Sequence, residues 1–300
     1  MDLNSIHIEK YNQPNDDDYL RRYIKPQFVD SFLRGDIYFA MLSQFSDSFE
    51  GITPTHYFMY QFLSRGLGHK FDFSKPIKEL NNDEEKIGTL LMFLGIYDLE
   101  KKLSRITGIT DKSELSALVK HHVENMNDFV KPQLDFQSKH YSSCWFVGDY
   151  IESALMWSAY SEPNGIAIRI KYSDFKDAIE TYFEKHTKAT IGIEECQSGL
   201  ITYADFNDSD DWLAQLEQGR NPVFYKQRFY KEEKEFRFVL KRYESYPFEA
   251  FTQKHKIFHE NSKFQIILHP SSGPDEMEKI RAKLPEDLKY RIEMSEMSFS

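Results

Sequence analysis

Apolar and polar residues alternate along several short segments of the chain, and this alternation predicts β-strands. Successive side chains of a strand point to opposite faces of a sheet, so one face of each segment can be buried while the other stays polar. Gly and Pro residues lie at the ends of several of these segments. The predicted strands are residues 19–24, 36–40, 141–147, 165–172, 199–203, 236–241, 263–268 and 288–294.

Other segments repeat their apolar residues every three or four positions, which is typical of amphipathic helices. Ser272 with Asp275 forms an N-cap signature before the last of them, and Pro274 suits its first turn. Residues 1–18 are polar and predict a mobile or loosely docked lead-in. Helices are predicted at 28–34, 150–160, 173–184 and 276–284, with further helices inside a block at 55–137.

The helical block at 55–137 interrupts the strands and has no linker-like flanks. Because the strands after the block need those before it as neighbours, we expect the block to be an insertion and not an independent domain. The sequence therefore predicts one α+β domain over residues 1–300, with a mixed, mostly antiparallel sheet and a helical insertion. About six or seven strands are expected in that sheet.

Composition narrows the class of protein. Hydrophobic residues make up 40% of the chain and aromatic residues 15%, too many for a disordered chain. The net charge of −10 argues against broad coating of nucleic acid, although a small basic site remains open. Cys144 and Cys196 form no disulfide framework, and with the lack of a secretory leader they predict a cytoplasmic protein. The longest apolar run, 89–96, is too short to span a bilayer, so no membrane association is expected.

The strongest candidate for chemistry is the strand near residue 236. If the chain is extended there, Glu233, Glu235 and Arg237 share one face, while Phe236 and Phe238 share the other. Carboxylates so close raise each other's pKa, and a nearby Arg lowers it. The cluster is therefore either a functional site or a solvated ladder of charges on an edge strand.

Small polar residues mark a second strand. Ser142 and Cys144 share one of its faces, and Ser143 and Trp145 share the other. Small hydroxyls allow a ligand to approach the backbone closely, although an ordinary serine-containing strand end has the same pattern.

Arg22 and Tyr23 lie on the first predicted strand, and the planar fork of an Arg binds two phosphate oxygens at once. A single strand Arg is otherwise a surface charge. Trp157 and Tyr160 are three residues apart on a predicted helix and share a face. Those two rings either pack in the core or form a platform for a ligand ring.

Several familiar signatures are absent from the sequence. There is no glycine-rich dinucleotide fingerprint, no phosphate-binding loop, no nucleophile elbow and no paired Cys-x-x-Cys motif. His255 and His259 are four residues apart, but no third metal ligand accompanies them. No metal site is therefore expected.

The order of motifs resembles domain-of-unknown-function family 2971, a resemblance that covers most of the chain outside the helical block. The family's Asn-Asp-Pro reads Ser46-Asp47-Ser48 in this chain. That family name implies no activity. The matching segments are Tyr23, 37–39, 45–50, 143–146, 156–160, Gly165, Lys226, Tyr230, Glu233, Glu235, Arg237 and 266–268.

A looser resemblance does imply an activity. Arg22, then Ser142 with Ser143, then Glu233 with Glu235 follow the order of the Arg–Ser–Glu class of ADP-ribosyltransferase toxins. The resemblance implies an ADP-ribosyltransferase-like fold with NAD as the substrate. It makes Glu235 the catalytic carboxylate and Glu233 the residue that orients the acceptor. In the same way, Arg22 would hold the NAD pyrophosphate, and the two serines would brace the ribose and the carboxylate.

The remaining NAD-binding positions expected from the resemblance are Tyr23, Trp157, Tyr160 and Arg237. The acceptor would be a macromolecule, either protein or nucleic acid, and the protein a toxin or phage-defence effector with an antitoxin as a partner. Two alternatives stay open. One is an NAD glycohydrolase, which uses the same Glu and Arg but transfers ADP-ribose to water. The other is a non-enzymatic protein-binding module.

Overall fold

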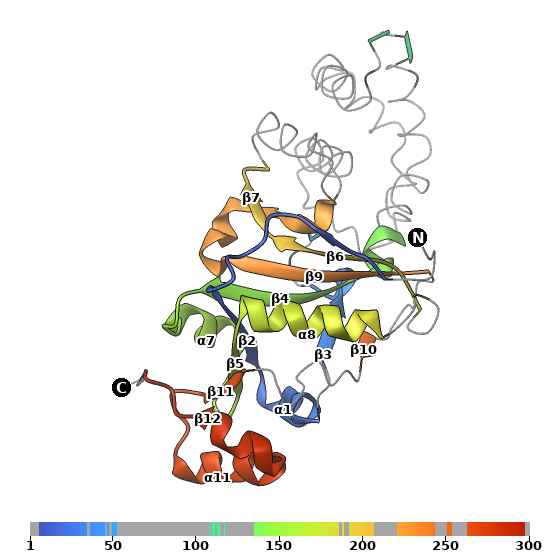
Figure 1. Cartoon of the computed structure of the whole chain (residues 1–300). Coiled ribbons are helices and arrows are strands. Elements are labelled where there is room, and N and C mark those ends of the chain that lie inside the picture. Colours follow the sequence, from blue (N-terminus) through green and yellow to red (C-terminus); the bar gives the residue numbers. More distant parts are fainter. Residues whose placement is uncertain are drawn as a thin grey trace, which may run out of the picture. The chain divides into compact units, whose positions relative to one another are not determined.

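The computed structural model describes residues 6–34, 37–45, 47, 50–52, 135–185, 188, 192–206, 221–243, 251–253 and 263–297, with isolated positions between 108 and 117 (Figure 1). The chain divides into two compact units. The first comprises Met1–Met41, His140–Tyr203 and Phe229–Ser300, and the second comprises Leu42–Lys139 and Ala204–Arg228. Most of the predicted insertion at 55–137 lies outside the described residues, so the insertion and the single domain stay predictions.

The first unit is built on one large sheet, whose strands follow the order β1-β6-β9-β4-β2-β5-β11-β12, with β3 paired to β4 and β10. Neighbouring strands are antiparallel except at the two ends, where β1–β6 and β11–β12 are parallel. The α+β class and the mostly antiparallel sheet are thereby confirmed. The strands are β1 (Ile8–Lys10), β2 (Tyr19–Ile24), β3 (Ile37–Met41), β4 (His140–Gly148), β5 (Ile166–Lys171), β6 (Ile193–Leu200), β9 (Glu235–Arg242), β10 (Phe251–Gln253), β11 (Gln265–Leu268) and β12 (Ile292–Glu293).

The ends of the sheet differ from the sequence-based expectation. Within the described residues the sheet has 10 strands in place of six or seven, and β1 from the lead-in and β10 were not predicted. The strand predicted at 199–203 begins earlier, at Ile193, and is followed by β7 (Thr202–Ala204). The polar run Glu194-Glu195 hides the alternation there. The strand predicted at 288–294 is mostly the 3-10 helix η5 (Glu286–Arg291), which is followed by the two residues of β12.

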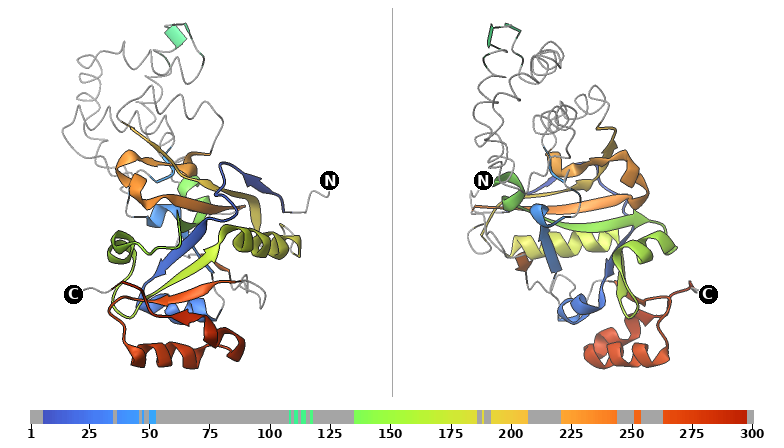
Figure 2. Two further views of the ribbon diagram at one scale, coloured as in Figure 1. Left: turned by 60° about the vertical axis from the view of Figure 1, so that its left-hand side comes forward. Right: turned by 180° about the vertical axis from the view of Figure 1, so that it is seen from behind.

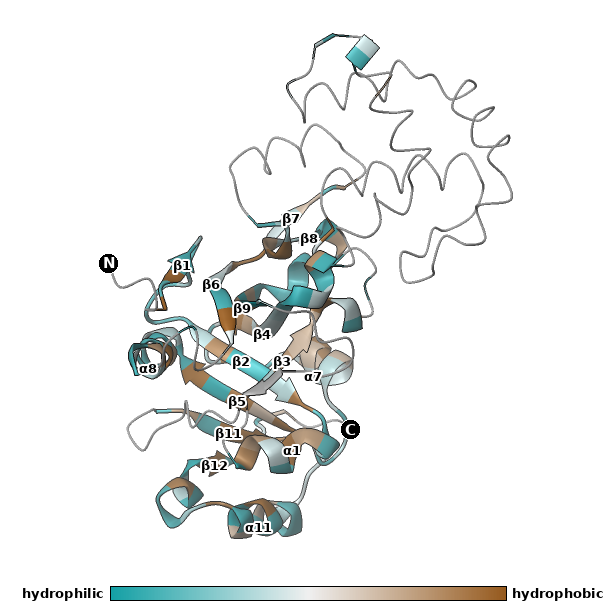
Figure 3. Ribbon diagram, turned by 90° about the vertical axis from the view of Figure 1, so that its right-hand side faces the viewer, coloured by the Kyte–Doolittle hydropathy of each residue, from teal (hydrophilic) through white to brown (hydrophobic). Residues whose placement is uncertain are grey.

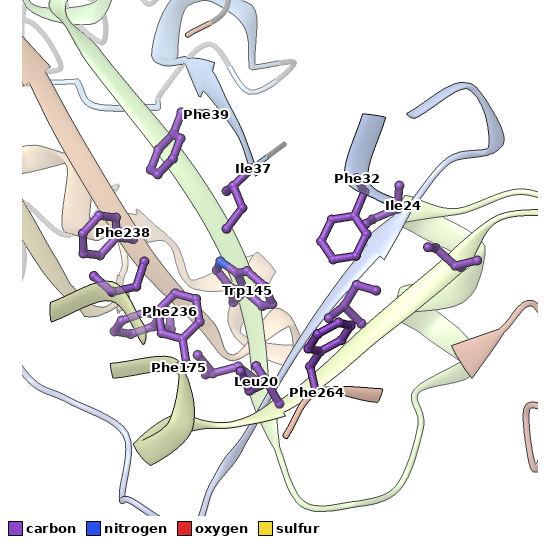
Figure 4. Packing of buried hydrophobic residues seen from close by; sticks show 14 of the residues in the cluster. Leu20, Ile24, Phe32, Ile37, Phe39, Trp145, Phe175, Phe236, Phe238 and Phe264 are labelled. Carbon is purple, nitrogen blue, oxygen red and sulfur yellow. The ribbon is translucent and has the colours of Figure 1, made fainter. Parts of the chain in front are cut away.

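One face of the sheet carries the main hydrophobic core. We call it the core face and define it by Leu20, Trp145, Phe236 and Phe238, which are all buried in one cluster (Figure 4). Helices α1 (Pro26–Leu33), α8 (Tyr172–Glu184) and α11 (Pro274–Lys283) contribute buried residues to that cluster, so they cover this face. Figure 2 shows α8 lying across the strands and α11 at the far end near α1.

The other face carries the residues that alternate with this core. We call it the arginine face and define it by Arg21, Arg169 and Arg237, which are all buried. On β5 the apolar Ile168 and Ile170 alternate with Arg169 and Lys171, and Figure 3 shows teal and brown bands following one another on this strand. Helix α7 (Ala154–Tyr160) packs on part of this face through Trp157. The sheet therefore separates an aromatic core from a layer that contains buried charges.

Helix starts follow from local capping. The helix predicted at 150–160 begins only at Ala154, because Ser153 caps it by accepting a hydrogen bond from the Met156 backbone N–H at 3.3 Å. Pro274 occupies the first turn of α11, as predicted, but the N-cap is Gly273 and no side chain caps that helix. The Ser272–Asp275 cap is therefore wrong, and Pro274 fixes the start.

Within the second unit, Glu50 is almost completely buried. Its carboxylate lies 3.4 Å from Lys226 Nζ, and its backbone carbonyl accepts from Gln137 Nε2 at 2.8 Å. Lys226 is the middle residue of strand β8 (Tyr225–Gln227), which directly follows the 3-10 helix η3 (Pro222–Phe224). Two of the segments that carry the resemblance to family 2971 thus meet in a buried ion pair of this unit.

Candidate functional site

Arg22 and Ser143 lie together on the core face. Arg22 donates from Nη1 to Ser143 Oγ at 2.7 Å and from Nη2 to the Tyr38 carbonyl at 2.6 Å. Trp145 Nε1 donates to the same hydroxyl oxygen at 3.1 Å, and the Arg22 guanidinium lies 5.8 Å from the Trp145 ring centroid. Burial lowers the pKa of Arg22 to about 10. Arg22 therefore connects β2 to β3 and β4 through bonds within the protein.

Glu235 and Arg237 form a buried ion pair on the arginine face. Arg237 donates from Nε to Glu235 Oε1 at 2.6 Å and from Nη2 to Oε2 at 3.2 Å. Their side chains are 7% and 0% exposed. Because β9 lies between β6 and β4, the alternative of a solvated ladder on an edge strand is wrong. A bidentate pair of this kind fixes the orientation of the carboxylate.

The resemblance implies one NAD site formed by Arg22, Ser142, Ser143 and Glu235, but only Ser142 lies on the same face of the sheet as Glu235. Arg22 alternates with the core residues Leu20 and Ile24, whereas Glu235 alternates with the core residue Phe236. Side chains on adjacent strand positions point to opposite faces, so Arg22 lies on the core face and Glu235 on the arginine face. The sheet itself separates the two groups.

Arg21, and not Arg22, lies on the same face of the sheet as Glu235. Strands β2, β4 and β9 are consecutive neighbours in the sheet. Arg21 pairs with Phe146 and Phe146 pairs with Glu235, so the three residues form one row across the strands. Adjacent strands are about 4.8 Å apart, which places the Arg21 and Glu235 Cα atoms roughly 10 Å from each other.

Ser142 and Cys144 lie on the same face, next to the ion pair. Cys144 pairs with Arg237 across β4 and β9, and Ser142 Oγ lies 3.4 Å from Cys144 Sγ. Burial raises the pKa of the Cys144 thiol, and the neighbouring Glu235 raises it further. The thiol is therefore neutral at physiological pH and a poor nucleophile. Cys144 and Cys196 are both free, so the predicted lack of a disulfide between them is confirmed.

Glu233 does not share the strand face of Glu235. It ends the 3-10 helix η4 (Arg228–Glu233), and β9 begins only at Glu235. Between them Lys234 has a φ of 42°, a left-handed backbone conformation that interrupts the alternation. The Tyr160 hydroxyl donates to Glu233 Oε1 at 2.6 Å, so the contact of Glu233 is with the end of α7.

Trp157 is a core residue. It is 0% exposed, its ring centroid lies 4.9 Å from that of Tyr23, and its Nε1 donates to Glu152 Oε2 at 2.7 Å. The Tyr23 hydroxyl accepts from the Ser153 backbone N–H at 3.3 Å. Tyr160, by contrast, is 40% exposed. Core packing is thus confirmed for Trp157, and the two rings of α7 do not form one exposed platform.

Three buried or central polar residues were missed by the sequence-based prediction: Arg21, Arg169 and Glu152. Arg169 carries a usable signal, because it stands between Ile168 and Ile170 in a mostly apolar strand. A charged side chain on such a strand is buried, and a buried charge needs a hydrogen-bonding or oppositely charged partner. Arg21 and Glu152 carry no such signal, since their roles depend on strand register and on the loop before α7.

In the part of the chain that the structure describes, no cluster of three or more His, Cys, Asp or Glu residues is placed to hold a metal ion. His255 and His259 lie outside the described residues. Among the helices of the described residues, none combines the length and apolar character needed to cross a membrane. The chain matches no family model, no curated protein and no solved structure, so both resemblances stay predictions.

Proposed function

We propose that the protein is an ADP-ribosyltransferase that cleaves NAD and transfers ADP-ribose to a macromolecule. One observation carries the proposal. The three strands that bear an Arg, a Ser and a Glu in chain order (β2, β4 and β9) are immediate neighbours in the sheet. Arg21, Ser142 and Glu235 lie on the same face of these strands. In the proposal, one NAD molecule contacts these three residues.

Glu235 is the catalytic carboxylate in this proposal. Cleavage of the nicotinamide–ribose bond passes through an oxocarbenium-like state, which a fixed negative charge stabilises. The bidentate bond from Arg237 holds the carboxylate in place and occupies one acceptor position on each oxygen. In this proposal the same carboxylate accepts a hydrogen bond from a ribose hydroxyl of NAD.

The other roles follow from position. Arg21 takes the part first assigned to Arg22 and holds the NAD phosphates, because it faces the same side as Glu235. Ser142 contributes a small hydroxyl next to the ion pair. Glu233 orients the acceptor once its bond to Tyr160 opens, and Tyr160 is exposed enough to move. Ser143 supports the site only indirectly, by holding Arg22 on the other face.

A second candidate is a non-enzymatic protein-binding module. The depth of the Glu235–Arg237 pair favours it, since a pair with 7% and 0% exposure can be purely structural. The two candidates differ in one outcome. If Glu235 is catalytic, removing its charge abolishes NAD turnover. If Glu235 is structural, removing its charge lowers only the stability of the protein.

Incubation of the full chain with labelled NAD and a cell lysate tests the proposal. The wild type is expected to place label on a macromolecule, Glu235→Gln to lose that label, and Glu232→Gln to retain it. Glu232 is an exposed residue of η4 and serves as the matched control. Free ADP-ribose without labelled macromolecule would indicate an NAD glycohydrolase. Equal turnover in the two variants would remove the support for any catalytic role of β9.

A further inference from the structure

Two arginines lie directly opposite each other on neighbouring strands of the arginine face. Strands β2 and β5 lie side by side (Figure 3). Arg21 on β2 pairs with Arg169 on β5, and their exposed fractions are 0% and 3%. Directly opposed residues of an antiparallel pair have Cβ atoms about 5 Å apart, and like charges in this position repel. Burial lowers the pKa of Arg21, and the neighbouring Arg169 lowers it further. Such a pair is destabilising unless negative charge balances it.

Arg169 has its balancing charge within the chain. It donates to a carboxylate oxygen of Glu293 on β12, from Nε to Gln265 Oε1 at 2.9 Å, and from Nη1 to the Tyr150 carbonyl at 3.1 Å. The Tyr150 ring lies over the guanidinium at 3.5 Å. Every nitrogen of this guanidinium is therefore engaged.

Arg21 has no carboxylate bonded to it, and Asp149 and Glu152 act on its charge only from a distance. Its Nη2 donates to the Asp149 carbonyl, while Nε and Nη1 are buried without a hydrogen-bond partner. A guanidinium has five N–H donors, so most of the hydrogen-bonding capacity of Arg21 is unused. The Asp149–Tyr150 turn holds both guanidiniums through its carbonyls, which fixes the two cations side by side.

We propose that Arg169 is a second phosphate-binding residue, and that Arg21 and Arg169 together bind a diphosphate group whose place beside Arg169 is held by Glu293 in the free protein. The identity of that diphosphate as part of NAD rests on the proposed function, whereas the anion site rests on the unpaired guanidinium. Two planar guanidiniums side by side match two linked phosphates, because each binds two oxygens.

Entry to the site is through Glu293. Its side chain is 34% exposed and covers Arg169, which is 3% exposed. A diphosphate that replaces the Glu293 carboxylate gains both cations, whereas Glu293 engages only Arg169. Glu293 is thus an internal competitor of the ligand, and the chain segment after it is anchored separately, since the Glu296 backbone N–H donates to Glu152 at 3.0 Å.

Titration of the full chain with inorganic pyrophosphate at constant ionic strength tests the site. Glu293→Gln is expected to bind pyrophosphate several-fold more tightly than the wild type, because the competing charge is removed. Arg21→Met and Arg169→Gln are expected to bind at least about tenfold more weakly. Arg21→Met should fold, since it removes a buried charge that is bonded to no carboxylate. Arg22→Lys, which changes the core face, is the control and should bind as the wild type does.

Equal pyrophosphate affinity in the wild type and in Arg21→Met and Arg169→Gln would overturn the site, and so would weaker binding by Glu293→Gln. Repeating the titration with Glu235→Gln separates this proposal from the previous one. Tight pyrophosphate binding without NAD turnover in the wild type would leave the anion site standing and remove the transferase. NAD turnover by the wild type, together with unaltered pyrophosphate binding in Arg169→Gln, would remove the anion site and leave the transferase standing.

Discussion

Arg21 and Arg22 are consecutive residues of β2, yet they face opposite sides of the sheet and have opposite surroundings. Arg22 is bonded to Ser143 and Tyr38 on the core face, whereas Arg21 leaves two nitrogens without partners on the arginine face. The two residues have the same chemistry and the same strand. Equivalent substitutions at the two positions therefore compare the two faces of the sheet directly.

Replacing each of these arginines by Lys should separate ligand binding from structure. Arg21→Lys is expected to lower kcat/KM for NAD about ten- to a hundredfold, because an ammonium group cannot bind phosphate in a bidentate manner. Arg22→Lys is expected to leave kcat/KM nearly unchanged and to lower stability by about 1 to 3 kcal/mol through its lost bonds to Ser143 and Tyr38. Steady-state kinetics and thermal unfolding of both variants measure this. The reverse pattern would place the ligand on the core face.

The Glu235–Arg237 pair predicts a stability effect that can be separated from catalysis. Glu235→Gln removes the carboxylate that pairs with the buried Arg237, and breaking a buried ion pair typically costs about 3 to 5 kcal/mol. The double variant Glu235→Gln with Arg237→Met removes both charges and should recover most of that stability. NAD turnover should remain lower by about a hundred- to a thousandfold in both variants, since the charge facing the oxocarbenium is absent. Recovery of turnover along with stability would show that the pair is only structural.

Trp157 should behave as a core residue. Trp157→Ala is expected to lower the free energy of unfolding by about 3 to 5 kcal/mol, because it empties a fully buried volume and leaves the Glu152 carboxylate without its indole donor. Tyr160→Phe on the same helix should cost far less, since that ring is 40% exposed and its bond to Glu233 lies near the surface. Chemical denaturation of both variants gives the comparison. An unaltered unfolding midpoint for Trp157→Ala would contradict the core position.

His269 should make stability depend on pH. Burial lowers the pKa of His269, whose ring lies 5.2 Å from that of Trp157 and contacts Ser271 Oγ at 2.8 Å. Below about pH 6.5 the His of the unfolded chain takes up a proton more readily than the buried His269, so protonation lowers the free energy of unfolding. Stability is fully present above that pH and falls as the pH drops toward the folded-state pKa.

Unfolding free energies at pH 7.5 and pH 5.5, compared between the wild type and His269→Gln, test this dependence. The loss on acidification should be smaller in the variant, because the titrating group is gone. A loss of the same size in both proteins would assign the acid sensitivity to other residues.

The interior strands could be predicted from the sequence, but their faces could not. Segments such as Phe236-Arg237-Phe238 alternate so regularly that only a strand buries their apolar side. On β2, however, Arg22 alternates with Leu20 and Ile24 while Arg21 alternates with Tyr19 and Tyr23, and both sets are acceptable core residues. Only pairing with β5, whose isoleucines alternate with Ala167 and Arg169, decides which Arg meets the core.

The candidate site could likewise be predicted only in part, because the sequence shows contacts within a strand but not between distant segments. Glu235 and Arg237 are two residues apart on one strand, so their shared face follows from the sequence alone. Arg169 and Glu293 are brought together by hydrogen bonds between residues 124 positions apart, and no local pattern reports such a contact. Glu233 was placed wrongly because the left-handed Lys234 breaks the alternation, so that β9 begins only at Glu235.

The three-residue strand β1 also has a consequence for solubility. It covers Cys196, Gln197 and Ser198 of the eight-residue strand β6, and Lys10 ends it with a positive charge. Uncovered backbone amides along β6 would offer a template on which a second molecule could add a strand. The lead-in of the chain therefore acts as a guard against self-association, and loss of its first dozen residues would favour aggregation more than it would weaken the interior of the protein.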